Sequence, residues 1–254
     1  MKKFITNKYV LTILGSILFF LAWIIISYSI DERMMIFPDP FSTIQETFRI
    51  LGTSYVYHCL LWTMIRMFIG FGISFILALL FGALAGHFPS LKTLFGPTIT
   101  VLKSVPTAAL VFLFLVIIGA KYAPILVVIL ISFPILYESI SAGINNIPEE
   151  IINASKIDGS KGLSTILRIR LPLSIPYILV GVASSFALSF KIEIMAEIIT
   201  GDTSHGIGSA IFYAKQSNPA NMVPIFAYSL IAIILVLLLT VIEDIVTRLV
   251  KKYY

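Results

Sequence analysis

The sequence predicts an all-α polytopic membrane protein with about six transmembrane helices and a short cytoplasmic helix between the fourth and the fifth. Composition is the first reason. Hydrophobic residues make up 58% of the 254 residues and charged residues only 12%, whereas a soluble domain carries roughly 25% charge. The second reason is the order along the chain, because the apolar residues form long runs and most Lys and Arg residues lie between them.

Six runs approach the roughly 20 apolar residues that a helix needs to cross a bilayer. They cover residues 11–30, 60–86, 99–119, 123–143, 173–195 and 224–245. Backbone groups in lipid must be bonded within the segment, and these runs are continuously apolar rather than alternating, so helices are favoured over barrel strands. We expect the first run to stay as a span, because it lacks a convincing signal-peptidase site.

The first span and the segment after it form a separate predicted part of the chain. Residues 1–58 are expected to hold the N-terminal transmembrane helix and an external connector, and residues 59–254 a transmembrane core with a polar segment at 148–172. In the connector, Ile44, Phe48 and Leu51 have helical spacing and Ser42 can cap the start. A short helix over Ser42–Leu51 is therefore predicted on the outer membrane surface.

The distribution of Lys and Arg sets the orientation in the membrane. With the N-terminus inside, the opposite face carries only Arg33, Arg49, Lys121 and Lys215. The cytoplasmic face then carries Lys2, Lys3, Lys8, Lys92, Lys156, Lys161, Arg168, Arg170, Arg248, Lys251 and Lys252. Both termini and the polar segment are thus predicted to be cytoplasmic, and the net charge of +5 is explained without a nucleic-acid partner.

Two prolines lie inside the third and fourth predicted spans. Pro106 follows Lys103 in the third span and Pro134 lies in the fourth. Each removes a backbone hydrogen bond and is expected to kink its helix.

The polar segment has the signals of a short helix. Pro148, Glu149 and Glu150 suit a helix start, because proline presets the backbone and the carboxylates face the positive end of the dipole. Gly159 or Gly162 can supply the left-handed residue that ends it. Pro172 then suits the first turn of the fifth span, where its missing N–H is not needed.

Ionisable residues within spans are candidate functional residues, since each costs about 2.5 to 3.5 kcal/mol to insert. Glu193 and Glu197 share one helix face, and Lys191 points elsewhere and is expected to pair with a neighbouring helix. We interpret Lys191, Glu193 and Glu197 as lining the solute path or its outer gate, with an ion pair that only fixes packing as the alternative. Arg66 and Lys103 are expected to extend to the interface, and Glu138 to have a packing role.

The polar segment also resembles a known signature. Three elements of the polar segment resemble the coupling loop of binding-protein-dependent ABC importer permeases, Glu-Ala-Ala-x3-Gly-x9-Ile-x-Leu-Pro. They are Asn153-Ala154-Ser155, Gly159 after three intervening residues, and Ile169-x-Leu171-Pro172 after nine more. Asn153 and Ser155 depart from that pattern. Further similarities to the branch serving sulfonates, taurine, nitrate and thiamine precursors lie in Thr63-x2-Arg66-x3-Gly70-Phe71 and in Ala196-Glu197-x8-Gly206-Ile207-Gly208.

The resemblance implies a permease in a bacterial cell membrane that imports a small solute. Separate ATPase subunits would grip the coupling residues, namely Asn153, Ala154, Ser155, Asp158, Gly159, Ile169, Leu171 and Pro172. An extracytoplasmic binding protein would deliver the solute, and a second, identical permease copy would complete the path. The chain has no Gly-x4-Gly-Lys-Ser/Thr motif, so no cofactor is expected here, and ATP and Mg would bind the partner ATPase. The resemblance suggests as solute a small anion such as a sulfonate or nitrate, or a thiamine-related pyrimidine.

Two other functions are open at this stage. One is an ion-coupled secondary transporter, in which Glu193 and Glu197 would bind the coupling ion. A membrane-embedded enzyme is the other, but the chain has neither a Gly-x-Ser-x-Gly nor a His-Glu-x2-His pattern. The single cysteine and three scattered histidines predict no disulfide and no metal site.

Overall fold

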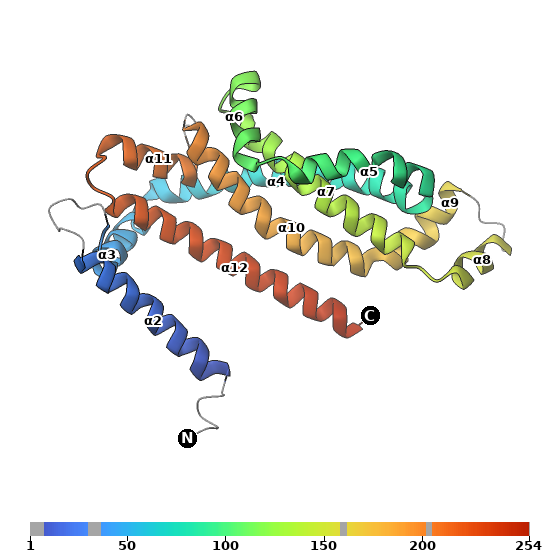
Figure 1. Cartoon of the computed structure of the whole chain (residues 1–254), viewed down its shortest axis with the longest axis horizontal. Coiled ribbons are helices and arrows are strands. Elements are labelled where there is room, and N and C mark those ends of the chain that lie inside the picture. The colour runs from blue at the N-terminus through green and yellow to red at the C-terminus, as the bar shows by residue number, and fades with distance from the viewer. Residues whose placement is uncertain (1–7, 30–36, 158–161, 202–204, 254) are drawn as a thin grey trace.

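The computed structural model describes residues 8–29, 37–157, 162–201 and 205–253, and within them every regular element is helical. The elements are α2 (Lys8–Ser29), α3 (Pro40–Leu51), α4 (Ser54–His87), α5 (Pro89–Ser104), α6 (Thr107–Ile118), α7 (Ala123–Asn145), α8 (Glu149–Ile157), α9 (Leu163–Thr165), η2 (Ile166–Arg170), α10 (Leu171–Thr200), α11 (Ile207–Ser217) and α12 (Val223–Tyr253). Figure 1 shows an elongated bundle with α8 at one end and α3 and α11 at the other. The predicted all-α class is confirmed.

Five helices among the described residues are long and apolar enough to cross a membrane, and α5 with α6 forms a sixth candidate that is bent by 94°. The third predicted span is therefore not one straight helix. Pro106 disfavours a helical conformation at Val105, whose φ of −73° and ψ of 128° are extended, so α5 ends there. Pro134, in contrast, stays inside a continuous α7.

The core is formed by α4, α7 and α10. Small residues repeat every fourth position on the buried face of α4 that meets α7, namely Gly70, Ser74, Ala78, Gly82 and Gly86. Close packing requires this pattern, because a Cβ added at Gly86 would lie 2.8 Å from Ile144 Cβ. On the other side of α7, the Ser132 and Ser189 hydroxyls share a 2.7 Å hydrogen bond that ties α7 to α10.

Helix α12 runs beside α10, whereas α2 leaves the bundle from the α3 end (Figure 1). Polar contacts hold the last part of α2, such as the 3.0 Å hydrogen bond from Trp23 Nε1 to the Pro38 carbonyl. Phe19 is 66% exposed, as suits a side chain that faces lipid.

The connector helix begins earlier than predicted and has a different cap. Asp39, not Ser42, is the N-cap, and its Oδ2 accepts the N–H groups of Phe41 at 2.8 Å and Ser42 at 2.9 Å. Asp39 is the cap because Pro40, the next residue, presets the backbone of the first helical turn. The exposed apolar side chains Phe41, Ile44 and Phe48 are consistent with a helix that lies on a membrane surface.

Candidate functional site

The polar segment forms a protruding element at one end of the bundle (Figure 1). As predicted, a helix follows Pro148, with Glu149 and Glu150 in its first turn. Ile152 is buried and anchors this helix, whereas Asn153 and Ala154 are exposed. The helix thus presents two of the predicted coupling residues outward on a fixed base.

The end of this segment is partly outside the described residues. Asp158 and Gly159 fall there, and for Ser155 the structure describes only the helical backbone. Of the two glycines expected to adopt a left-handed conformation, Gly162 has a φ of 55° and its carbonyl accepts the N–H of Thr165 at 3.1 Å. Gly162 therefore begins the return path to the membrane.

Pro172 lies in the first turn of α10, as the sequence predicts, although α10 continues a helical path that starts earlier. The helical path begins at Leu163 and passes through the π turn η2 before α10, with the Leu171 N–H donating to the Ile166 carbonyl. A wider turn accommodates a proline ring that would otherwise press on the carbonyl four residues earlier. Ile169 and Leu171 are half-buried, so they join the coupling segment to α10 rather than facing outward.

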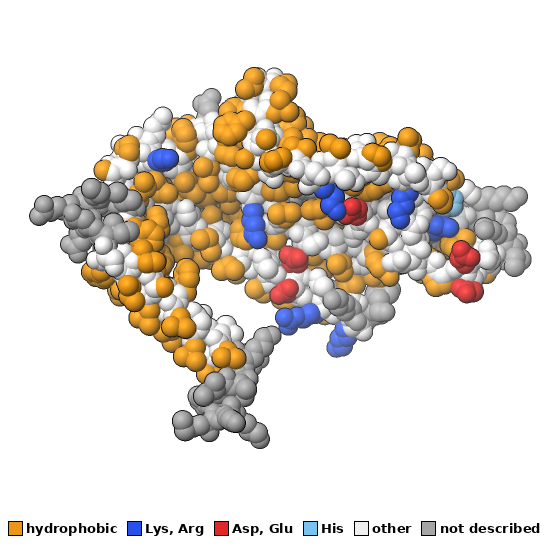
Figure 2. Space-filling view, in the orientation of Figure 1, with side chains coloured by type: hydrophobic (Ala, Val, Ile, Leu, Met, Phe, Trp, Pro, Cys, Tyr) orange, Lys and Arg blue, Asp and Glu red, His pale blue; other side chains and the backbone are white. Residues whose placement is uncertain are grey.

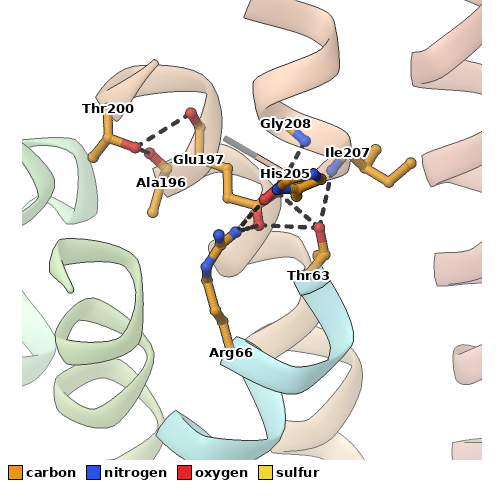
Figure 3. Close-up of polar contacts among 8 residues, drawn as sticks. All are labelled: Thr63, Arg66, Ala196, Glu197, Thr200, His205, Ile207 and Gly208. Atoms are coloured by element: carbon orange, nitrogen blue, oxygen red, sulfur yellow. Dashed lines mark hydrogen bonds and ion pairs between the residues drawn. The ribbon is translucent and has the colours of Figure 1, made fainter. Parts of the chain in front are cut away.

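A second polar site lies at the opposite end, buried between α4, α10 and the start of α11 (Figure 3). Glu197 Oε1 accepts a hydrogen bond from Arg66 Nη1 at 2.7 Å, and Glu197 Oε2 accepts one from the Thr63 hydroxyl at 2.8 Å and one from the Gly208 N–H at 3.0 Å. Thr63 Oγ1 also accepts the Ile207 N–H at 2.9 Å. We call these residues, Thr63, Arg66, Glu197 and Gly208, the buried polar cluster.

The glycines after α10 make this cluster possible. A Cβ at Gly206 would lie 2.6 Å from Glu197 Cδ, and one at Gly208 would lie 2.8 Å from the Ile198 nitrogen. Arg66 Nη1 also donates to the His205 carbonyl at 2.6 Å. The segment that leads into α11 is thus held against α4 by one carboxylate and one guanidinium.

Arg66 does not extend to the interface as predicted. Its residue is 8% exposed, and it forms a buried ion pair with Glu197. Glu197 has no exposed surface, so an arginine that reached the interface would leave a buried charge unpaired, which is strongly unfavourable.

The other ionisable residues separate into a buried and an exposed set. Glu193 is also fully buried, and neither of its carboxyl oxygens has a hydrogen-bond partner. Lys191 is exposed, and among the described residues no ion pair to a neighbouring helix is formed, contrary to expectation. Lys103 and Glu138, which were expected to act separately, form a half-exposed pair at 2.8 Å between α5 and α7.

The contacts at these two sites hold neighbouring segments of the chain in position. Within the described part of the chain, no three His, Cys, Asp or Glu side chains gather as metal ligands. The buried polar cluster fixes an interhelical contact, and the polar segment exposes Asn153 and Ala154 at the end of the bundle.

The chain is similar to known proteins in sequence and in fold. The family described as "Binding-protein-dependent transport system inner membrane component" matches residues 74–252. A protein named as an ABC transporter permease from Brucella melitensis biotype 1 is 25% identical over 173 residues, which are 68% of this chain and 70% of that protein.

Two further relatives carry names that mention a solute. A protein named as an aliphatic sulfonates transport permease of Bacillus subtilis (strain 168) is 27% identical over 62% of this chain and 57% of its own length. A nitrate import permease of Leptolyngbya laminosa is 27% identical over 67% of this chain and 61% of its own length. Among solved structures, an amino acid ABC transporter crystallised with histidines shares the fold, with a TM-score of 0.64, 17% identity, and coverage of 83% of this chain and 98% of that one.

Proposed function

The chain belongs to the family of binding-protein-dependent transport-system inner-membrane components. From this premise we propose a role for each end of the helical bundle in an ABC importer permease. The α8 end binds the ATPase subunits in the cytoplasm. The end with α3, α11 and the buried polar cluster faces the binding protein outside. ATP and Mg bind the ATPase partners, and this chain supplies the path and the coupling.

The observation that carries this assignment is the position of α8 (Figure 1). It connects α7 with the helical path that leads into α10, and those two helices pack closely along the core. A push on Asn153 and Ala154 is therefore transmitted to both helices, because a packed core shifts between discrete arrangements rather than deforming. Family membership favours this mechanism over ion-coupled transport through Glu193 and Glu197.

Charge supports the proposed orientation. Lys92, Arg168, Arg170, Arg248 and Lys252 are described residues of the predicted cytoplasmic set, whereas Arg49, Lys121 and Lys215 belong to the opposite set. An excess of Lys and Arg marks the cytoplasmic side. Both termini are then cytoplasmic as well, in a multi-pass protein of the cell membrane.

A second copy of the chain would cover α5. This helix exposes Lys92, Thr93, Thr98, Thr100 and Ser104, and polar side chains within a span face a bundle interior or a water-filled cavity rather than lipid. We propose a homodimer in which α5, α7 and α10 of both copies border the solute path. Lys191 would line it, since it shares an exposed face of α10 with Tyr177 and Ser184 at a spacing of seven residues.

Site-directed crosslinking tests the assignment of α8. A photoactivatable reagent is attached to Ala154→Cys after Cys59, the only cysteine, is replaced by alanine. We expect it to capture the ATPase subunit, whereas the same reagent on Ser217→Cys, at the end of α11, should not. Capture of the ATPase only from Ser217→Cys would overturn the proposal.

A further inference from the structure

A polar recess lies between α5 and α7, away from both sites described above. Its volume is about 360 Å³, and its lining includes Lys92, Gly96, Thr100, Tyr137, Glu138 and Ser141. Figure 2 shows several Lys and Arg side chains over α10, α7 and α5, with an acidic side chain among them.

Two hydroxyl groups at the base of the recess have no hydrogen-bond partner. Tyr137 is 4% and Ser141 is 2% exposed, and both oxygens are buried and unpaired. The residues are four apart on α7, so they lie on the same helix face. Buried hydroxyls are nearly always bonded, and two unpaired ones that line a single recess indicate a ligand that bonds to both.

The charges around the recess favour an anion. Glu138 is neutralised by Lys103, whose Nζ lies 2.9 and 2.8 Å from the two carboxyl oxygens. Lys92 is exposed, and no described carboxylate forms an ion pair with it. The recess therefore has one uncompensated positive charge beside two hydroxyl donors, the donor set that binds oxoanions.

We propose that this recess is a holding site for the transported solute, and that the solute carries a small oxoanion group of the kind found in sulfonates and nitrate. The site rests on the proposed function, because it lies on the face assigned to the solute path. Tyr137 and Ser141 donate hydrogen bonds to the oxyanion, and Lys92 supplies the charge. The aromatic wall formed by Phe95 and Phe133, whose rings lie 6.5 and 6.0 Å from that of Tyr137, keeps the Tyr137 ring in position.

Equilibrium binding to the permease–ATPase complex in nanodiscs, without the binding protein, tests this site. The probes are radiolabelled methanesulfonate and nitrate, each against chloride at matched ionic strength. We expect saturable binding of at least one probe to the natural chain. Each of Tyr137→Phe and Ser141→Ala should weaken it about tenfold, since one hydrogen bond to a charged ligand is lost.

Matched variants separate binding from folding. Ser74→Ala also removes a buried, unpaired hydroxyl, and Tyr28→Phe makes the same Tyr-to-Phe change on α2, outside the recess; both should bind like the natural chain. Gly96→Leu should abolish binding by filling the recess, because no atom lies within 4 Å of an added Cβ, and Gly72→Leu, with the same free space on α4, should not.

A failure of the holding site can be distinguished from a failure of the proposed function. If neither anion binds saturably, or if Tyr137→Phe and Ser141→Ala bind like the natural chain, the holding site is wrong even when ATP-driven uptake is intact. If the complex binds an anion saturably but ATP drives no uptake of it, the holding site survives and the proposed function fails.

Discussion

At the scale of single residues, the ion pairs show how strongly burial decides what a charge does. Arg66–Glu197 and Lys103–Glu138 have nearly equal lengths, 2.7 and 2.8 Å, but the first is buried and the second is about half exposed. When a buried pair loses one partner, the remaining charge has no solvent around it. When a half-exposed pair loses one partner, water hydrates the remaining charge. The two pairs are therefore expected to respond differently to the same change.

Arg66→Ala should destabilise the protein by about 3–5 kcal/mol, while Lys103→Ala should cost at most about 1 kcal/mol. The measurement is the midpoint of thermal unfolding of the purified complex in detergent. The double variant Arg66→Met with Glu197→Met should recover much of the loss, because it removes the unpaired charge. Equal effects of the two alanine variants would contradict the assigned difference in burial.

Gly208→Ala should also be destabilising, by about 1–3 kcal/mol. Its Cβ would lie 2.8 Å from the Ile198 nitrogen, which is backbone and cannot move aside as a side chain can. The same substitution at Gly72, where nothing lies within 4 Å, should be neutral or slightly stabilising, because alanine favours helix. Both variants are compared by the yield and melting midpoint of the folded complex.

At the scale of helices, the sequence was sufficient where a local signal acts alone. The apolar runs located the long spans, and Pro148 with two glutamates located α8. It was insufficient where two signals compete locally. Asp39 and Ser42 are both good caps, and only the conformation that Pro40 imposes decides between them.

Asp39→Ala should weaken α3 by about 0.5–2 kcal/mol, and Ser42→Ala by less. Amide hydrogen exchange over α3 measures this, with faster exchange expected for the first variant. If Ser42→Ala had the larger effect, the cap would be the one that the sequence suggested.

The same cap should respond to pH. Partial burial acts to raise the pKa of the Asp39 carboxyl, but hydrogen bonds from the Ser42 hydroxyl and from the N–H groups of Ser42 and Phe41 outweigh it and hold that pKa below its ordinary value. The capping contribution is thus complete above the unfolded-state pKa of about 3.9 and is lost as pH falls through the lower folded-state pKa. The protection of the α3 amides, measured relative to the intrinsic exchange rate at each pH, should fall in that acidic range in the natural chain and stay insensitive to it in Asp39→Ala.

At the scale of the whole molecule, the sequence predicted the residues of the candidate sites better than their pairing. Thr63, Arg66, Glu197 and Gly208 all stood out as parts of separate patterns, but their union depends on α4 and α10 being neighbours. Which helices adjoin is not encoded in any one span, since every apolar run meets the same requirement for length and hydrophobicity. Arg66 was misplaced for this reason, and Lys103 with Glu138 were not recognised as partners.

The polar side chains that remain exposed lead to the last prediction, which concerns how two copies meet. Helix α5 exposes Thr98 and Ser104, whereas α12 exposes Ile234, Leu237 and Val241. Lipid favours the second surface, and a partner or an aqueous path favours the first. In a Cys59→Ala background, a nitroxide attached to Leu237→Cys in the assembled complex should be relaxed strongly by oxygen, which concentrates in lipid, and a nitroxide attached to Thr98→Cys should be protected from that relaxation. Equal relaxation at both positions would place α5 against lipid and exclude it from the interface between copies. Protection of Thr98→Cys that disappears when the complex is dissociated would instead show that a second chain covers α5.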